Sequence, residues 1–244
     1  ISVEEFMPDR IDVKLELSKK EMFAGDSLKA TITATNMFGP PASDRKYELQ
    51  FTVDRGNFYS KNFPQYNFSI QTDNKSPLTA DGIREGKTDA KGSATETFVA
   101  PAEWNDQGLL SVKAFATVTD ETGRPVNRAV SFPIFTQKEF FGIKMNDFYV
   151  NRGEKFIIPL IVTDKDGKAI GSEAHVQVVR YDWYSSLERD QYGNRYHYIS
   201  KKKEVLLADQ VITLTSKGHD FSYVPRESGE YEIRIQKPGS SRFV

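Results

Sequence analysis

The sequence predicts an all-β protein built from two tandem β-sandwich modules. Gly, Pro, Asn and Asp residues recur at short intervals between runs of alternating apolar and polar residues, and no run shows the 3.6-residue period of a helix. The length of 244 residues suits two units of about 100–150 residues each. A strand between two glycine turns, at residues 23–42, returns 128 residues later, with Gly25 matching Gly153 and Gly39 matching Gly167.

The repeated strand shows period-2 alternation in the same phase in both copies. Its inward residues are Leu28, Ala30, Ile32 and Ala34 in the first copy and Phe156, Ile158, Leu160 and Val162 in the second. Pro159 lies on the outward side of the second copy and cannot donate to a ladder. We therefore expect this second strand at a sheet edge or at a bulge.

The first module is expected to span residues 1–136. Its other strands are predicted at residues 11–17, 47–53, 110–118 and 130–134, with one more ending at Pro101. Residues 54–92 differ in character, because they are polar and repeatedly broken by Gly and Pro. We interpret them as a solvated insertion that contains a short strand or hairpin, and only residues 66–70 carry strand alternation.

The second module is expected to span residues 137–244, with strands at 174–181, 211–214, 221–224 and 231–235. A long aromatic hairpin at residues 182–203 is its most distinctive segment. The hairpin contains Trp183, Tyr184, Tyr192, Tyr196 and Tyr198, with Gly193-Asn194 near its tip. Few residues follow Pro238-Gly239, so we expect the last strand of this module to be incomplete.

Composition excludes several classes of partner and chemistry. The formal net charge is −1, which gives no electrostatic reason to expect nucleic acid. Cysteine is absent, so disulfides, thiolate metal sites and cysteine nucleophiles are excluded from this sequence. No apolar run approaches the roughly 18 residues of a membrane span, so we expect no membrane contact by these residues themselves. The start at Ile1 without a signal peptide suggests an interior fragment of a longer protein.

No motif of catalysis, cofactor binding or metal binding stands out. His175, His197 and His219 show no metal-ligand spacing and are read as structural or surface residues. Residues 164–167 (DKDG) faintly resemble a calcium loop, but Lys168 occupies the third ligand position and His175 the place of the final Glu. We interpret them as a hairpin turn. The sequence thus predicts no catalytic residue, no cofactor site, no metal site and no enzyme activity.

The aromatic hairpin allows two interpretations. Its rings could form a stacking platform for a sugar or a peptide, or they could pair across a two-stranded ribbon and pack on a neighbouring domain. We favour the second.

Several stretches resemble a known family. Residues 3–11 (VEEFMPDRI), the Gly25-Asp26 turn and residues 36–42 (NMFGPPA) are similar to an interior macroglobulin domain of bacterial α2-macroglobulins. Residues 179–183 (VRYDW), the tyrosine-rich hairpin and residues 228–233 (SGEYEI) fit the domain that follows it. The resemblance implies an Ig-like or fibronectin III-like sandwich for each module.

The resemblance also implies a role in a protease-trapping protein of the periplasm or cell envelope, with a lipid anchor left open. Members of this family usually trap proteases after bait cleavage, often through a Cys-Gly-Glu-Gln thioester. Because this sequence has no cysteine, the thioester lies outside it. We expect a non-catalytic framework whose partners are neighbouring macroglobulin domains and, through the full-length protein, trapped proteases. A surface adhesin or carbohydrate-binding array and an accessory domain pair of an enzyme are the alternatives.

Overall fold

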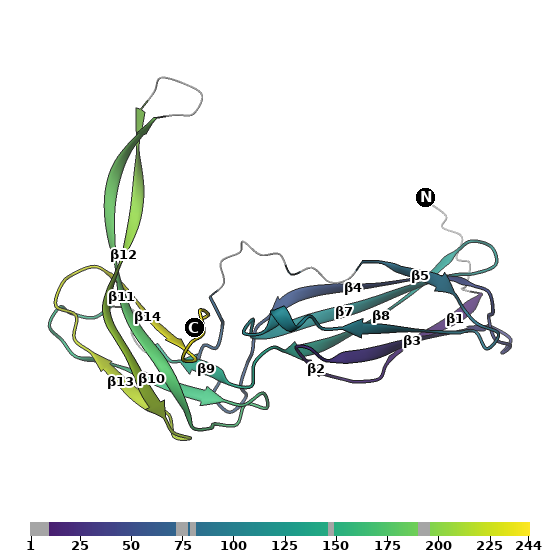
Figure 1. The fold of residues 1–244 in the computed structure, drawn as a ribbon, viewed down its shortest axis with the longest axis horizontal. Coiled ribbons are helices and arrows are strands. Elements are labelled where there is room, and N and C mark those ends of the chain that lie inside the picture. The colour runs from purple at the N-terminus through teal and green to yellow at the C-terminus, as the bar shows by residue number, and fades with distance from the viewer. Residues whose placement is uncertain (1–9, 72–77, 79–81, 146–148, 190–195) are drawn as a thin grey trace, which may run out of the picture. The chain divides into compact units, whose positions relative to one another are not determined.

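The computed structural model describes residues 10–71, 78, 82–145, 149–189 and 196–244 (Figure 1). The chain divides into two compact units. Unit 1 comprises Ile1–Asn57 and Asp73–Gln137, and unit 2 comprises Phe58–Thr72 and Lys138–Val244. Regular structure in the described part is β-strand apart from one 3-10 turn at Ala102–Trp104, so the all-β prediction is confirmed. None of the described helical structure is long and apolar enough to cross a membrane.

Unit 1 is a sandwich of a three-stranded and a five-stranded sheet, with strand orders β1-β3-β6 and β2-β8-β7-β4-β5. Its strands are β1 (Ile11–Leu17), β2 (Met22–Phe23), β3 (Ser27–Asn36), β4 (Lys46–Gly56), β5 (Arg84–Lys87), β6 (Ser93–Val99), β7 (Leu109–Thr119) and β8 (Pro125–Phe135). The alternating residues of β3 are buried as predicted. At the centre of the core, the rings of Phe51 and Phe98 stack with centroids 4.5 Å apart, joining the two sheets.

Unit 2 is a sandwich of two three-stranded sheets, with orders β13-β10-β9 and β12-β11-β14. Its strands are β9 (Phe140–Ile143), β10 (Phe156–Thr163), β11 (Ser172–Arg189), β12 (Tyr196–Leu214), β13 (His219–Tyr223) and β14 (Glu230–Gln236). Ile158, Leu160 and Val162 of β10 point into the core together with Ala174 and Val176 of β11. Val244 and Ile235 exchange two backbone hydrogen bonds at the free side of β14. The completeness of the last strand stays a prediction.

The two units repeat the same backbone hydrogen bonds 128 residues apart. In unit 1 the Gly39 N–H donates to Asn36 O, and the Asn36 N–H donates to Pro40 O. In unit 2 the equivalent bonds run from Gly167 N–H to Asp164 O and from Asp164 N–H to Lys168 O. Both glycines have positive φ, 97° and 76°, which a residue without Cβ adopts at little cost. The repeat read from the sequence is therefore a repeat of backbone geometry.

Pro159 lies neither on an edge strand nor at a bulge, so that prediction is wrong. β10 is the central strand of its sheet, with β13 along its first half and β9 along its second. The Pro159 carbonyl accepts a 3.0 Å hydrogen bond from Lys144 N–H, just beyond the end of β9. The return bond of this antiparallel pair would need a Pro159 N–H. The proline thus stands where the β9 ladder stops, and the missing donor disrupts no continuing ladder.

Residues 58–72 lie between β4 and β5 in the sequence but pack within unit 2. The Phe58 ring stacks on Phe140 at 3.9 Å, and Phe68 meets Phe58 edge-on at 5.3 Å. Phe68 approaches so closely to Gly142 that a Cβ there would lie 2.5 Å from its ring. Asn67 exchanges two backbone hydrogen bonds with Ile143 at the edge of β9. The segment therefore covers the outer face of β9.

The structure corrects the prediction of one solvated insertion at residues 54–92. Phe58, Ser60 and Phe68 are buried, because their side chains pack on unit 2. Residues 66–70 make an isolated bridge at Asn67 where a strand was expected, and the strand of this stretch is β5, paired with β4. The placement of residues 58–72 in unit 2 also differs from the contiguous modules that we expect from the sequence.

Candidate interaction surface on the β11–β12 hairpin

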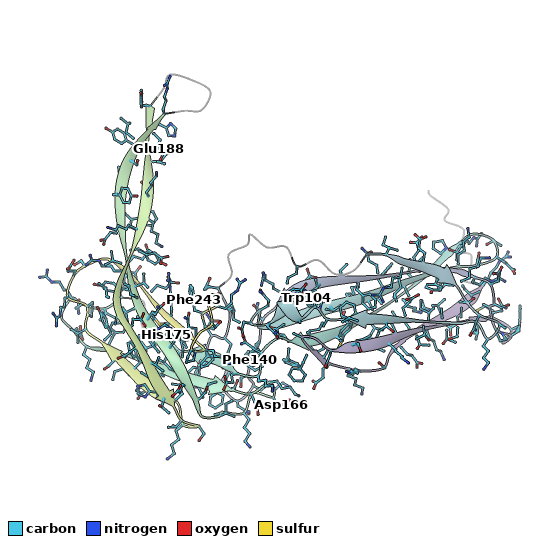
Figure 2. The ribbon with its side chains drawn as sticks, in the orientation of Figure 1. Trp104, Phe140, Asp166, His175, Glu188 and Phe243 are labelled. Carbon is cyan, nitrogen blue, oxygen red and sulfur yellow. The ribbon has the colours of Figure 1, made fainter. Side chains whose placement is uncertain are left out.

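The β11–β12 hairpin extends beyond the sandwich of unit 2 (Figure 1). The two strands pair from Ser172↔Leu214 to Arg189↔Tyr196. On its other side β11 pairs with β14 only as far as Tyr181↔Glu230. Beyond that point the ribbon has two strands, and Glu188 marks its outer part in Figure 2. A two-stranded hairpin in water is marginally stable by itself, so contacts at its base or along a face matter for its order.

One face of the outer ribbon is aromatic. Strand alternation places Tyr181, Trp183 and Leu187 of β11 on the same side, together with Tyr198 and Tyr196, which lie opposite Leu187 and Arg189. We call these five residues the aromatic face. Trp183, Leu187, Tyr196 and Tyr198 are all more than half exposed, and Tyr198 reaches 76%. The opposite face bears Asp182, Glu188, Lys201 and Lys203 beside Tyr184 and Ile199. Exposed large side chains gathered on one face are typical of an interaction surface.

Glu230 of β14 fixes the inner end of the aromatic face. The Trp183 indole N–H donates to Glu230 Oε2 at 3.0 Å, and Lys202 Nζ donates to Glu230 Oε1 at 3.0 Å. The same Lys202 ammonium lies 3.3 Å from the Tyr181 ring centroid and 5.4 Å from that of Trp183. The hydrogen bond from Lys202, with that from Trp183, holds the pKa of Glu230 below its usual value. The Trp183 ring is therefore held by a carboxylate and a cation.

Arg234 of β14 completes the base of the hairpin. Its guanidinium donates to the Tyr181 hydroxyl at 2.9 Å, to Glu204 at 3.0 Å and to Glu232 at 2.9 Å. The Tyr181 hydroxyl in turn donates to Glu232. Burial, together with this bond to Glu232, raises the pKa of Tyr181 to about 12. Tyr181 thus stays a neutral donor over the physiological range, and the network ties β11, β12 and β14 together.

The structure places the aromatic residues of the predicted hairpin differently from the favoured interpretation. Trp183 lies opposite Lys202, Tyr184 opposite Lys201 and Tyr198 opposite Leu187. The expected pairing of aromatic rings across the ribbon is therefore wrong for these residues, because each faces a lysine or an aliphatic side chain. Tyr192 and Gly193-Asn194 lie outside the described residues. Whether this face packs on a neighbouring domain stays a prediction.

The three histidines lie on three different strands of unit 2. His175 is on β11, where its Nε2 contacts Asp209 and its Nδ1 lies 3.2 Å from Gln236 Nε2 (Figure 2). His197 lies opposite Glu188 on the hairpin, and His219 pairs with Leu160 through β13. Within the described part of the chain, no three His, Cys, Asp or Glu side chains come together as metal ligands would. The structure does not bring the histidines together.

Residues 164–168 form a tight turn as predicted, but only an isolated bridge between Thr163 and Ala169 closes it, because the flanking strands β10 and β11 lie in different sheets. Asp164 Oδ1 accepts hydrogen bonds from the Asp166 N–H at 3.0 Å and the Lys168 N–H at 2.9 Å. Asp89 and Asp120 accept from the residues two and four positions later in the same way. An aspartate that caps its own turn in this manner is a common local motif. The acidic turns are therefore structural elements of the fold.

Sequence reasoning missed Lys202, Glu230 and Arg234 as parts of this surface. Glu230 is 47 residues from Trp183 in the sequence and comes close only because β14 pairs with β11. The Ser228-Gly229-Glu230 stretch marked the start of a strand, and no local pattern linked it to the hairpin. The ion pair between Lys202 and Glu230 therefore depends on how the strands are arranged in the sheet.

Comparison with known proteins identifies both units. The profile of the Bacterial Alpha-2-macroglobulin MG5 domain matches residues 9–135, and that of Bacterial macroglobulin domain 6 matches residues 142–243. An alpha-2-macroglobulin homolog of Nostoc is 24% identical over 238 residues, which cover 96% of this chain and 12% of the relative. A homolog of Yersinia pestis is 25% identical over 244 residues, covering 97% and 12%.

Solved structures show the same fold. The native conformation of Escherichia coli alpha-2-macroglobulin superimposes with a TM-score of 0.67 at 18% identity, covering 98% of this chain and 16% of that one. The trypsin-activated Escherichia coli protein gives 0.66 at 19% identity, covering 99% and 16%. The chain thus spans about an eighth to a sixth of the length of these relatives. From the two profile matches, which together cover nearly all of its residues, it follows that the chain belongs to the bacterial alpha-2-macroglobulin family.

Proposed function

We propose that this chain is a non-catalytic framework segment of a longer, protease-trapping alpha-2-macroglobulin of the periplasm or cell envelope. The two family matches span both units, while the chain covers only 12% of its Nostoc relative. Related proteins have been solved in forms activated by trypsin and by porcine elastase. These relatives respond to proteases, which supports a protease-dependent role for the longer polypeptide. The lipid anchor is left open.

The aromatic face is the feature that supports a role for this segment in contacts between domains. Its four exposed side chains project from a ribbon whose base is fixed by Glu230, Lys202 and Arg234. A rigid base under exposed rings suits a permanent contact, because little side-chain entropy is lost when the partner arrives. We infer that the hairpin docks on another domain of the same polypeptide and keeps the framework aligned.

The geometry at Trp183 weighs against the carbohydrate-binding alternative. Sugar recognition needs an open ring face and free polar groups beside it. Here the indole N–H is taken by Glu230, and the Lys202 ammonium lies over the ring. A protein surface can still pack on the exposed part of Trp183 and on Leu187, Tyr196 and Tyr198.

Protease challenge tests the proposed function. The longer polypeptide and the 244-residue chain are each incubated with trypsin or elastase, and products are separated under denaturing and native conditions. We expect the longer polypeptide to retain the protease and the 244-residue chain to form no adduct. A covalent adduct between the chain itself and a protease contradicts the framework role. In a parallel glycan-binding assay, sugar affinity that Trp183→Ala abolishes would favour the adhesin alternative.

A further inference from the structure

The side chain of Phe38 in unit 1 is almost fully exposed to solvent. It lies at the tip of the turn that follows β3, with 98% of its surface exposed, and its neighbour Met37 is 59% exposed. Phenylalanine is among the residue types most often buried in folded proteins. The turn therefore presents a large apolar group that unit 1 does not use in its own core.

The turn that carries Phe38 is well ordered by hydrogen bonds. Gly39 N–H donates to Asn36 O at 2.8 Å, and Asn36 N–H donates to Pro40 O at 2.9 Å. The Asn36 side chain donates to Pro41 O at 3.3 Å, and Met37 N–H donates to Arg10 O at 3.1 Å. The backbone on both sides of the ring is thus fixed, so Phe38 projects from a rigid support.

Unit 2 shows that the turn itself does not need these residues. At the equivalent positions it has Lys165 and Asp166, and its hydrogen bonds from Gly167 to Asp164 and from Asp164 to Lys168 repeat those of unit 1. Asp166 is exposed at the corner of this turn (Figure 2). Because a polar pair supports the same backbone, the side chains of Met37 and Phe38 are not needed to form the turn.

In unit 2 another segment of the chain packs on this turn. Gly167 is buried, and its carbonyl accepts hydrogen bonds from Ser60 Oγ at 3.1 Å and Asn62 Nδ2 at 3.0 Å. Both donors belong to a segment that precedes β10 by about 100 residues in the chain. Gly39 is exposed, and a Cβ on it would meet nothing within 4 Å. The same position is therefore covered in unit 2 and open in unit 1.

The adjoining sheet faces limit the size of the contact in unit 1. The outer face of β9 and β10 in unit 2 carries Phe140 and Ile161 where it is covered. The matching face of β1 and β3 carries Asp12, Thr33 and Thr35. These residues are polar, so an apolar contact beside this turn is confined to the turn tip.

We propose that Phe38, flanked by Met37, inserts into an apolar pocket on a domain that lies N-terminal to residue 10 in the longer polypeptide. The inference rests on the proposal that the chain is part of a longer protein, and the chain covers only 12–16% of its relatives. We place this domain on the N-terminal side because, in unit 2, the segment that covers the turn precedes the turn in the sequence. A single aromatic side chain in a pocket is an effective anchor between protein surfaces.

Photo-crosslinking in the longer polypeptide tests this anchor. Phe38 is replaced by p-benzoylphenylalanine, and peptides crosslinked on irradiation are identified by mass spectrometry. We expect a crosslink to a peptide from a domain N-terminal to residue 10, and loss of that crosslink when Met37→Asp is added. The matched control places the same label at Asp166, the equivalent turn position, and should give no crosslink to that domain.

A crosslink only to residues 10–244 or only to a second molecule overturns the proposal, as does the absence of any crosslink. The readout is independent of protease trapping. If the longer polypeptide fails to trap a protease but the crosslink forms, the anchor stands and the proposed function falls. If the longer polypeptide traps a protease but no crosslink forms, the anchor is rejected and the proposed function stands.

Discussion

Trp183 and Glu230 join the outer hairpin to β14 through a 3.0 Å hydrogen bond from the indole N–H to the carboxylate. Lys202 binds the other oxygen of the same carboxylate, also at 3.0 Å. One side chain of β14 thus orients both an exposed ring and the cation beside it. The order of the aromatic face should depend on this carboxylate.

We expect Glu230→Ala to change the environment of Trp183 and leave Trp104 unaffected. The chain has two tryptophans, one exposed and one buried in unit 1, so fluorotryptophan NMR gives one resonance for each. The Trp183 signal should shift and broaden, because the ring loses its acceptor and the cation beside it loses its partner. Glu230→Gln keeps an acceptor without charge and should give a smaller shift. Glu227→Gln, which alters the Arg180 pair instead, is the control; a shift of equal size there would argue against a specific link.

The Trp183 resonance should also titrate with pH. The Lys202 and Trp183 hydrogen bonds lower the pKa of Glu230 below the ordinary glutamate value of 4.5. A carboxylate with a lowered pKa in the folded state stabilises the fold above the unfolded value, and this contribution is lost as pH falls through the folded value. The midpoint should therefore lie below pH 4.5. A midpoint at or above that value, or an unchanged transition in Glu230→Gln, is incompatible with this assignment.

Asp120→Ala should destabilise unit 1 by about 1–3 kcal/mol, the usual cost of losing hydrogen bonds to a charged acceptor. Asp120 is buried, and its Oδ1 accepts from the Thr122 N–H, the Thr122 hydroxyl and the Arg124 N–H. Burial raises its pKa, but these bonds outweigh burial and lower it overall. Asp120→Asn keeps one acceptor and should lose less. Urea unfolding followed at Trp104 provides the measurement, and equal loss in both variants counts against the turn-capping role.

Gly167→Ala should cost more stability than Gly39→Ala. Both positions have positive φ, so each alanine incurs a backbone penalty of about 1–2 kcal/mol. At Gly167 the added Cβ would also lie 2.8 Å from Ser60 Oγ, whereas at Gly39 it meets nothing within 4 Å. The fluorescence of Trp183 reports the unfolding of unit 2 and that of Trp104 the unfolding of unit 1, so the two losses of stability can be measured separately. Equal losses of stability in the two variants would show that the contact between Ser60 and Gly167 is not tight.

Phe68→Ala should release residues 58–72 from unit 2. Phe68 is buried against Phe58 and Gly142, and truncating a buried phenylalanine typically costs about 3–5 kcal/mol. The exposed Lys61 nearby offers a trypsin site, so cleavage there should become faster. Phe63→Ala removes a partly exposed ring of the same segment and is the control. Unchanged cleavage in Phe68→Ala would show that the segment is held by other contacts.

The regular part of the fold could be predicted because its signals are local. The burial of Leu28, Ala30 and Ile32 follows from period-2 alternation, and the glycine turns at Gly39 and Gly167 follow from residue type. The hairpin follows from its aromatic composition and its turn residues. These features depend on residues that are near one another in the sequence.

The remaining features depend on topology, which no local pattern encodes. Phe58 and Phe68 show no strand or helix period relative to each other, and their partners Phe140 and Gly142 are more than 70 residues away. The sequence predicts a sheet edge or a bulge at Pro159 because it does not show where β9 ends. The Glu230 contact with Trp183 needed the pairing of β11 with β14.

Hydrogen exchange of the outer hairpin tests most directly whether the chain acts as a docked framework. Exchange is compared for residues 183–189 and 196–202 between the 244-residue chain and the longer polypeptide, with β7 as the internal reference. We predict fast exchange in the chain alone, as for an isolated two-stranded ribbon, and at least about tenfold slower exchange in the longer polypeptide. Equally fast exchange in both would contradict docking of the hairpin and with it the framework role proposed here.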